Sequence, residues 1–426
     1  MFVELNATHD PERRSWLASA NIAGGDFPIQ NLPFGLFKAD GSAPRGGIAL
    51  GDQIIDLSKL ADRLGGAALA ASGTTLAPLF AQSPHALSAL RAALSDLYAS
   101  DSQDRSTAEA ALVPMASVEL LLPAKPSAFA DFCCSIEHVR RMAATSGRPI
   151  AACAERLPVS YNGRASSVAV SGTSVVRPKG QSEFPPGSGD IKFQPERRLD
   201  YELEFGVWLR GGNALGTSIT VAEAEAMLFG CSIVNDWSAR GIQFFESMLG
   251  PHLGKNFMTT VSPWIVTMEA LAPFRVAARG RADDEAAVPA HLFDANDRAH
   301  GGIQITMTAD LATATSGPVR ICTSGFETMF WTLAQMVAHQ ASSGAPIEAG
   351  DLLASGTVSG PAEDAKACLA EFNQRGANPA LFADGSKRVW LEDGDTLTIT
   401  AMAHAGGFVP IGFGPCTGTI HPAIVG

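Results

Sequence analysis

Two acidic residues, Glu202 and Glu204, stand two positions apart in the segment YELEFGVW. On a β-strand this spacing places both carboxylates on one face, with Tyr201, Leu203 and Phe205 on the other. Neighbouring carboxylates repel each other unless water screens them or a cation neutralises them. A hard divalent cation that takes oxygen ligands would remove the repulsion. The segment therefore fits either an ordinary strand with a solvated face or part of a metal site.

Two further acidic residues follow apolar runs. Asp131 lies in SAFADFCC and Asp236 lies in CSIVNDWSAR. Each of them, taken alone, also fits a helix cap or a turn. Together with the glutamate pair they would supply four carboxylates, a donor set suited to Mg²⁺ or Ca²⁺. Convergence of the four in space is a hypothesis at this point.

His138 follows Asp131 by seven residues, about two helical turns, so both side chains could lie on the same side of the chain. An isolated histidine is more often a surface or core residue than a functional one. Beside a metal site, however, an imidazole can act as a general base near neutral pH.

Motifs for other chemistries are incomplete or absent. GPHLGKN is one residue too short for a phosphate-binding loop and lacks the Ser or Thr that should follow Lys255. The sequence also contains neither G-x-S-x-G nor H-E-x-x-H. Nucleotide binding, serine hydrolysis and zincin chemistry are therefore poorly supported.

The elements that must position these residues are predicted to be mostly β-strands. From about residue 120, runs such as ASSVAVSGTSVVRP and VWLEDGDTLTITA alternate with Gly and Pro turns, and helices are expected at 135–145, 221–229 and 326–340. Because strands and helices do not alternate regularly, we expect a large, mostly antiparallel mixed sheet. Upstream, GGIALGDQIIDLSKL predicts two strands joined by a turn, and a helix is expected to begin at Ser83-Pro84. The polar run near 95–110 is predicted to be a linker.

Composition limits the class of protein. The chain has 426 residues, of which 46% are hydrophobic, a net charge of −12, and seven cysteines without a C-x-x-C pair. The acidic balance argues against nucleic acid and anionic membrane surfaces as partners. The first residues lack the apolar run of a signal peptide, and no apolar stretch is long enough to span a membrane. We expect a soluble, cytoplasmic protein with reduced thiols.

Long blocks of the sequence carry a family resemblance. They run in order along the chain and include DFPIQNLPFGLF, LPVSYNGRASSVAVSGT, LDYELEFGVW, GPHLGKNFMTTVSPWIV, GDLLASGTVSG and GFGPCTGTIHPA. The chain thereby resembles the full-length, two-domain enzymes of the fumarylacetoacetate hydrolase family. The resemblance implies a fold that is mostly β with some α: an N-terminal SH3-like barrel over 1–118 and a C-terminal mixed β-roll catalytic domain over 119–426. It also implies a homodimer.

The same resemblance assigns roles to individual residues. The implied metal ligands are Asp131, Glu202, Glu204 and Asp236, with Lys255 and Thr259 close to the ion. The implied general base is His138, oriented by Glu371, and the oxyanion-stabilising groups are Arg240, Gln243 and Lys255. The positions that match substrate contacts are Cys133, Arg148, Tyr161, Gln243, Ser247 and Thr357.

The chain departs from the family on the substrate side. Cys133 stands where the family has a substrate-contacting tyrosine, Ser247 stands near a second one, and Asn162 replaces a histidine. The loop after His138 is shortened, so that Arg148 is one place out of register with the family's substrate arginine. A site that loses hydroxyl groups should tolerate a different acyl chain.

The implied activity is hydrolysis of a carbon–carbon bond in a small 1,3-diketo acid, as in the cleavage of fumarylacetoacetate to fumarate and acetoacetate during tyrosine and phenylalanine catabolism. The implied cofactor is a divalent cation, Mg²⁺ or Ca²⁺, with Mn²⁺ as a further option. One alternative is a 2-keto acid decarboxylase, isomerase or hydratase that uses the same metal. Another is a binding or scaffold protein without activity.

Overall fold

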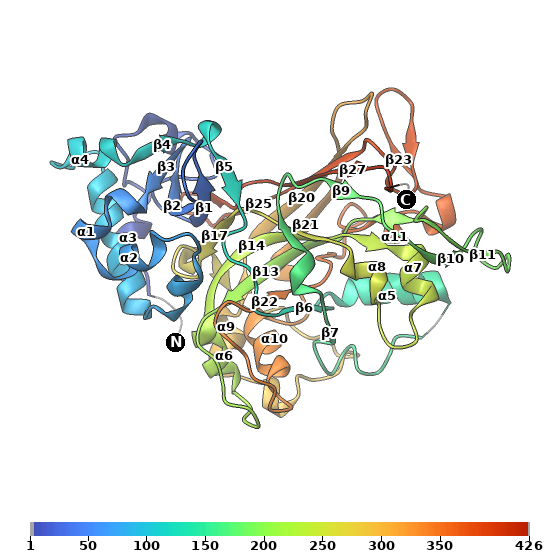
Figure 1. Cartoon of the computed structure of the whole chain (residues 1–426). Coiled ribbons are helices and arrows are strands. Elements are labelled where there is room, and N and C mark those ends of the chain that lie inside the picture. Colours follow the sequence, from blue (N-terminus) through green and yellow to red (C-terminus); the bar gives the residue numbers. More distant parts are fainter. Residues whose placement is uncertain (1–3, 148, 425–426) are drawn as a thin grey trace.

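The computed structural model describes residues 4–147 and 149–424. Figure 1 shows the N-terminal strands and helices gathered on one side of the molecule and the later elements on the other. The N-terminal elements are β1 (Phe34–Lys38), β2 (Arg45–Leu50), β3 (Gln53–Asp56), α1 (Ala61–Leu64), α2 (Gly66–Ala71), α3 (Pro84–Tyr98), α4 (Arg105–Ala110), β4 (Leu112–Pro114) and β5 (Glu119–Leu121).

The N-terminal strands pair antiparallel in the order β4-β3-β2-β1, and β5 also pairs with β1. The predicted strand–turn–strand is confirmed as the β2–β3 hairpin. The predicted helix from Ser83-Pro84 is confirmed as α3, because the Ser83 side chain accepts a hydrogen bond from the backbone N–H of Ala86. The SH3-like barrel is not confirmed, because within the described residues no pairing leads from β4 back to close the sheet.

This sheet does not end at β1. It continues through β17 into the larger part of the chain, in the order β1-β17-β14-β13-β22-β6-β7, with β16 and β8 attached beside β14. Its further strands are β6 (Phe129–Phe132), β7 (Ser160–Asn162), β8 (Val168–Val170), β13 (Leu203–Leu209), β14 (Leu228–Asp236), β16 (Thr259–Val261), β17 (Trp264–Thr267) and β22 (Leu352–Ala354). The pairs β22–β6 and β16–β8 are parallel and the others are antiparallel, which confirms the predicted large mixed sheet.

A second sheet has the order β21-β20-β25-β27-β9, with β26 beside β25. Its strands are β9 (Val175–Val176), β20 (Ile305–Ala312), β21 (Val319–Gly325), β25 (Thr396–Ala403), β26 (Ile411–Gly412) and β27 (Cys416–His421). Short two-stranded pairs complete the β-structure: β10 (Lys179–Glu183) with β11 (Ile191–Pro195), β12 (Leu199–Asp200) with β15 (Ser238–Ala239), β18 (Arg275–Val276) with β19 (Gly302–Ile303), and β23 (Ala380–Leu381) with β24 (Lys387–Arg388).

The later helices are short. They are α5 (Ile136–Ser146), α6 (Val221–Met227), α7 (Arg240–Phe245), α8 (Leu253–Asn256), α9 (Ala295–His300), α10 (Leu333–Gln340) and α11 (Leu369–Phe372). The predicted helices at 135–145 and 221–229 are confirmed as α5 and α6. The predicted helix over 326–340 is divided, because a 3-10 turn at 326–328 is followed by a new helix that Thr332 caps. No helix in the described part of the chain is long and apolar enough to cross a membrane.

The predicted linker near 95–110 is wrong. Residues 95–98 belong to α3 and residues 105–110 form α4, and both Tyr98 and Ala108 are buried. The Tyr98 hydroxyl donates a hydrogen bond to the Ala108 carbonyl at 2.9 Å, which joins the two helices. Polar residues face solvent along this segment, while its few apolar side chains anchor it to the core.

Candidate functional site

The four predicted carboxylates converge. Asp131 lies on β6, Glu202 lies directly before β13, Glu204 lies on β13, and Asp236 ends β14. Each offers an oxygen atom within 4.8 Å of the others, and all four side chains are buried. The central strand β13 is buried on both faces, so the alternative of a strand with a solvated face is wrong.

Some of these oxygens have no hydrogen-bond partner. Within the described residues, neither carboxylate oxygen of Glu204 nor Oδ1 of Asp131 accepts a hydrogen bond. Burial, and then the neighbouring carboxylates, raise the pKa of both groups well above the ordinary values. Buried oxygens without donors, gathered from four carboxylates, fit a hard divalent cation such as Mg²⁺ or Ca²⁺.

The other two carboxylates are paired with Lys255, which is buried on the short helix α8. Its ammonium group donates to Glu202 and, at 2.8 Å, to Oδ2 of Asp236. Burial alone would lower the pKa of Lys255, but Asp236 and Glu202 raise it, so the ammonium stays charged. Two hydroxyl groups also bind Asp236, because Tyr161 donates to Oδ2 at 2.6 Å and Thr259 donates to Oδ1 at 2.7 Å.

Arg240, at the start of α7, extends the cationic side of the site. Its Nη2 lies 2.9 Å from Oε1 of Glu202 and 2.8 Å from Oδ2 of Asp200. Its Nη1 donates to the side-chain oxygen of Gln243, one turn along the same helix, at 3.1 Å. Arg240, Gln243 and Lys255 line one pocket together with two of the carboxylates, Asp131 and Glu202.

His138 and Glu371 form a close pair. Nδ1 of His138 lies 2.7 Å from Oε1 of Glu371, which is fully buried on α11, and the Ser359 hydroxyl donates to the same oxygen at 2.5 Å. With Nδ1–H directed at a carboxylate, Nε2 is left as the basic nitrogen. The expectation that two helical turns connect Asp131 and His138 is wrong, since β6 carries Asp131 and α5 carries His138. Both residues nevertheless line one pocket.

The carboxylate cluster and the histidine open into a pocket of about 600 Å³, within the range of small-molecule sites. Five of the predicted substrate contacts line it: Cys133, Tyr161, Gln243, Ser247 and Thr357. Its outer wall is apolar and includes Val139 and Met142 of α5, Val159, Phe244 and Leu249. Arg148 lies outside the described residues, and Asn162 lies on β7 without lining this pocket.

Cys133 is not a candidate nucleophile. Burial and then the nearby carboxylates raise the pKa of its thiol to about 12, so the thiolate is scarce near neutral pH. Cys133 therefore offers a small, uncharged side chain to the pocket.

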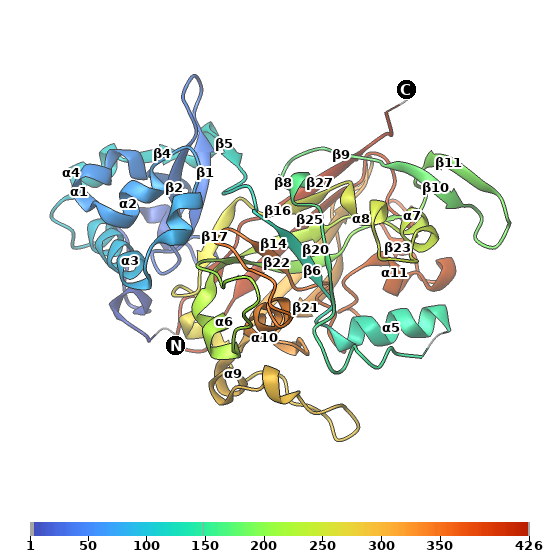
Figure 2. The same ribbon diagram turned by 60° about the horizontal axis from the view of Figure 1, so that its bottom comes forward.

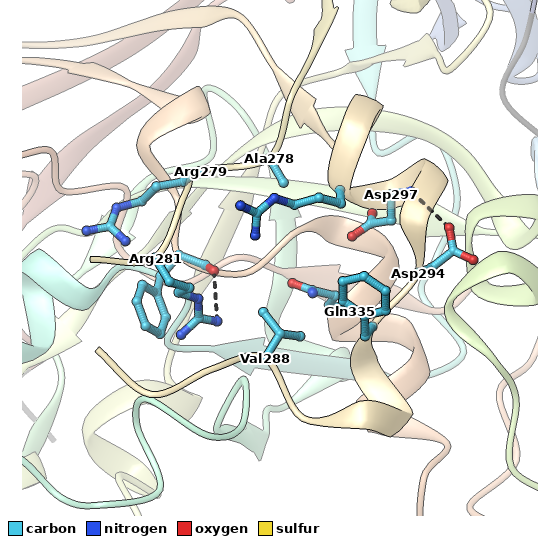
Figure 3. A pocket seen from close by; sticks show the side chains of 10 residues that line it. Ala278, Arg279, Arg281, Val288, Asp294, Asp297 and Gln335 are labelled. Carbon is cyan, nitrogen blue, oxygen red and sulfur yellow. Dashed lines mark hydrogen bonds between the residues drawn. The ribbon is translucent and has the colours of Figure 1, made fainter. Parts of the chain in front are cut away.

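A second hollow, shown in Figure 3, is lined by Arg279, Arg281 and Asp297 among others. Its volume is about 20 Å³, roughly the space of one water molecule, which excludes a substrate. Arg279 pairs with Glu285, and Arg281 stacks over the Phe330 ring at 3.3 Å from its centroid. Both arginines are thus engaged in contacts within the protein that stabilise the surrounding segments.

Sequence reasoning missed three residues that hold the site together: Asp200, Ser359 and Arg141. Asp200 accepts hydrogen bonds from the backbone N–H groups of Leu369 and Ala370 as well as from Arg240. The alternation that identified Glu202 and Glu204 extends back to Asp200 and could have found it. Ser359 and Arg141 carry no such signal, because their partner Glu371 is distant in the sequence.

The fold and the site define a protein that can hold a divalent cation beside a histidine–carboxylate pair in a small-molecule pocket. Residues 127–421 match the family model described as fumarylacetoacetate hydrolase C-terminal, and residues 30–123 match fumarylacetoacetase N-terminal. The chain is 38% identical over 420 residues to a fumarylacetoacetase of Oryza sativa subsp. japonica, covering 94% of this chain and 96% of that one. It is 36% identical over 414 residues to the fumarylacetoacetase of Homo sapiens, covering 94% and 97% respectively. The chain therefore belongs to the fumarylacetoacetate hydrolase family.

Solved structures share the fold at lower identity. A fumarylacetoacetate hydrolase from Exiguobacterium antarcticum superposes with a TM-score of 0.51 at 15% identity, covering 92% of this chain and 99% of that one. At this identity the similarity concerns the fold alone.

Proposed function

We propose that this chain hydrolyses a carbon–carbon bond of fumarylacetoacetate, or of a closely related diketo acid, to give fumarate and acetoacetate. The observation that carries the proposal is that His138, paired with Glu371, lines the same pocket as Asp131 and Glu202 of the buried four-carboxylate cluster. The relatives that share 35–38% identity with nearly the whole chain are named fumarylacetoacetase, which supports the same activity. We further propose that Mg²⁺ or Ca²⁺ is the bound ion, that residues 119–426 form the catalytic domain, and that the enzyme is a cytoplasmic homodimer.

The reaction requires that carbon leave as a stabilised carbanion. A diketo acid meets this requirement because the leaving fragment departs as an enolate. A divalent cation held by Asp131, Glu202, Glu204 and Asp236 would supply Lewis-acid stabilisation of the enolate's negative charge.

The protein's own groups would move the proton. Nε2 of His138 takes a proton from a water molecule, and the oxygen of that water bonds to the carbonyl carbon next to the scissile bond. Glu371 holds Nδ1–H and stabilises the imidazolium that forms. When the carbon–carbon bond breaks, its electron pair passes into the enolate, and the proton on His138 is available for the enolate carbon.

Three hydrogen-bond donors in the same pocket, Arg240, Gln243 and Lys255, would stabilise the tetrahedral alkoxide. Arg240 and Lys255 are held by buried carboxylates, and Gln243 is fixed by Arg240, so these donors are oriented before substrate binds. Loss of one such donor typically costs about 100- to 1,000-fold in rate.

The test is a panel of diketo acids that includes fumarylacetoacetate and acylpyruvates of different chain length, followed by loss of enol absorbance with and without EDTA. We expect Mg²⁺-dependent cleavage, and we expect His138→Ala to lower kcat by about 100- to 10,000-fold. The relative cleavage rates across the panel also show which acyl chains are accepted by a pocket that contains Cys133 and Ser247.

If no acid is released from any member of the panel, hydrolysis is the wrong activity. A decarboxylase or isomerase would instead keep much of its rate in the His138→Ala variant, because those reactions need the enolate-stabilising ion but not this water-activating pair.

A further inference from the structure

Arg141 lies on α5, one turn after His138, and reaches the same carboxylate. Its Nη1 donates to Oε2 of Glu371 at 3.1 Å, while His138 occupies Oε1. Its Nη2 donates to the Gly360 carbonyl at 2.8 Å and to the Ala362 carbonyl at 3.1 Å. Figure 2 shows α5 directly beside α11, the helix that carries Glu371, and the two helices are in contact. Arg141 therefore fixes Glu371 against both α5 and the 360–362 loop.

The buried carboxylate of Glu371 needs a positively charged partner besides His138. The side chain of Glu371 is fully buried, and a buried carboxylate without a partner cation is costly. A general base must begin the reaction as a neutral imidazole, which carries no compensating charge. Burial alone would raise the pKa of Glu371, yet His138, Ser359 and Arg141 together hold it below its ordinary value. Arg141 is the permanently charged member of that set.

Neighbouring groups do not supply this charge. Ser359 and Cys368 also contact Glu371, and Cys322 of β21 lies near it, but burial raises the pKa of both thiols, so they stay neutral. The adjacent residue Arg140 points elsewhere, to Glu137 and Glu285. Arg141 is not among the pocket-lining residues, so contact with substrate does not account for its position.

We propose that Arg141 is a positioning residue for the general base: it supplies the positive charge that keeps Glu371 ionised while His138 is neutral, and it fixes the carboxylate against Nδ1 of His138. This inference rests on the proposed function, because it assigns Glu371 and His138 to water activation. It predicts that Arg141 affects catalysis through Glu371 and leaves both the metal cluster and substrate binding intact.

The experiment compares three variants of the full chain with wild type. Arg141→Met removes the charge at similar length, Arg141→Lys restores a charge without the planar fork, and Arg140→Met is the matched control on the same helix. We expect Arg141→Met to lower kcat by about 10- to 100-fold with KM changed less than threefold. Arg141→Lys should recover part of this loss, and Arg140→Met should remain within about twofold of wild type, because Arg140 does not contact Glu371 and its partner Glu285 keeps Arg279. Mn²⁺ affinity, measured by calorimetry, should be the same in all four proteins.

Two further readouts separate positioning from general damage. The acidic limb of the pH–rate profile should move to higher pH in Arg141→Met, because removal of a nearby positive charge favours the protonated imidazole. The downfield proton NMR signal of a histidine Nδ1–H bound to a carboxylate, assigned by its loss in His138→Ala, should shift or broaden in Arg141→Met.

The proposal is overturned if Arg141→Met retains the wild-type kcat and pH profile, if Arg141→Lys is no better than Arg141→Met, or if Arg140→Met loses as much activity. It is also overturned if Arg141→Met loses Mn²⁺ binding, which would show general damage to the site. Failure of the proposed function gives a different result: wild type itself would be inactive, and the NMR arm would still test the contact between Arg141 and Glu371.

Discussion

At the scale of single residues, Glu204 shows most clearly the free-energy cost of burying carboxyl groups in this site. It is fully buried, neither of its carboxylate oxygens accepts a hydrogen bond within the described structure, and burial raises its pKa well above the ordinary value of 4.5. The carboxyl group of Glu204 therefore loses its proton at a lower pH in the unfolded chain than in the folded protein. In the metal-free protein the contribution of Glu204 to stability therefore falls as pH rises above 4.5 toward the raised pKa. A bound cation would remove this penalty.

We predict opposite effects of Glu204→Gln with and without metal. In metal-free protein at pH 7 the variant should melt at or above the wild-type temperature, because a glutamine has neither a charge to bury nor a proton to take up on folding. Wild type should gain about 2.7 kcal/mol from Mg²⁺ supplied at 100 times its Kd, whereas the variant should lose most of this gain. Calorimetric melting with EDTA and with Mg²⁺ measures both effects.

The control for this substitution is Glu109→Gln, a change in an exposed pair with Arg105 that should alter neither melting temperature. A metal-free Glu204→Gln protein that melts several degrees below wild type would contradict the view that the buried Glu204 carboxyl group destabilises the metal-free protein.

At the scale of elements, the site depends on short helices whose ends are fixed by side chains. α11 has four residues, too few to be stable alone, and its backbone N–H groups at Leu369 and Ala370 donate to Asp200 at 2.7 Å and 3.0 Å. The same carboxylate accepts from Arg240 at 2.9 Å. One side chain, Asp200, thus holds both α11, which carries Glu371, and the guanidinium of Arg240.

We predict that Asp200→Asn lowers kcat by about 10- to 100-fold, the range typical of residues that orient a metal site's ligands. An asparagine has one acceptor oxygen, so it cannot serve both the α11 N–H groups and the Arg240 guanidinium. Steady-state kinetics on the best diketo acid of the panel measures the change.

Asp297→Asn serves as the matched control, because Asp297 is also buried and accepts hydrogen bonds from Thr332, but it lines the small hollow of Figure 3 instead of the active-site pocket. Its kcat should stay near wild type. Equal losses in the two variants would show that buried aspartates act through general stability here.

At the scale of the whole molecule, the N-terminal part and the rest of the chain share one core. Phe80 stacks on Trp208 at 5.8 Å between ring centroids and meets Phe229 edge-on at 4.9 Å. β1 pairs with β17, so the main sheet itself crosses between the two parts. β13 and β14, which carry Glu204 and Asp236 of the carboxylate cluster, are therefore packed against N-terminal residues.

We predict that residues 119–426 expressed alone do not form a stable catalytic domain, because removal of the N-terminal part exposes Trp208 and Phe229 to water. Size-exclusion chromatography and near-ultraviolet circular dichroism should show aggregation or loss of fixed tertiary structure. In the full chain, Phe80→Ala should cost about 3–5 kcal/mol of unfolding free energy. A monodisperse, active 119–426 fragment would show instead that the catalytic part folds independently.

The sequence by itself determined those features that depend on local spacing. Alternation placed Glu202 and Glu204 on one face of a strand, Ser83-Pro84 began a helix, and the Gly-Asp turn joined two strands, since strand pleat, helix caps and turns are set by neighbouring residues. Local context also suggested Asp131, Asp236 and His138 as candidates, and the resemblance to a family then assigned their roles and added Glu371.

Only the tertiary structure decided how these groups meet. Glu371 lies 233 residues after His138, and its contacts with Arg141 and Ser359 follow from the packing of α5, α11 and the 360–362 loop. Tertiary contacts also fix the segment 95–110, which was predicted to be a linker. Most of its residues are polar, and only the fold shows that Tyr98 and Ala108 are buried. Long-range contacts of this kind depend on which surfaces are buried together, and that is a property of the whole folded chain.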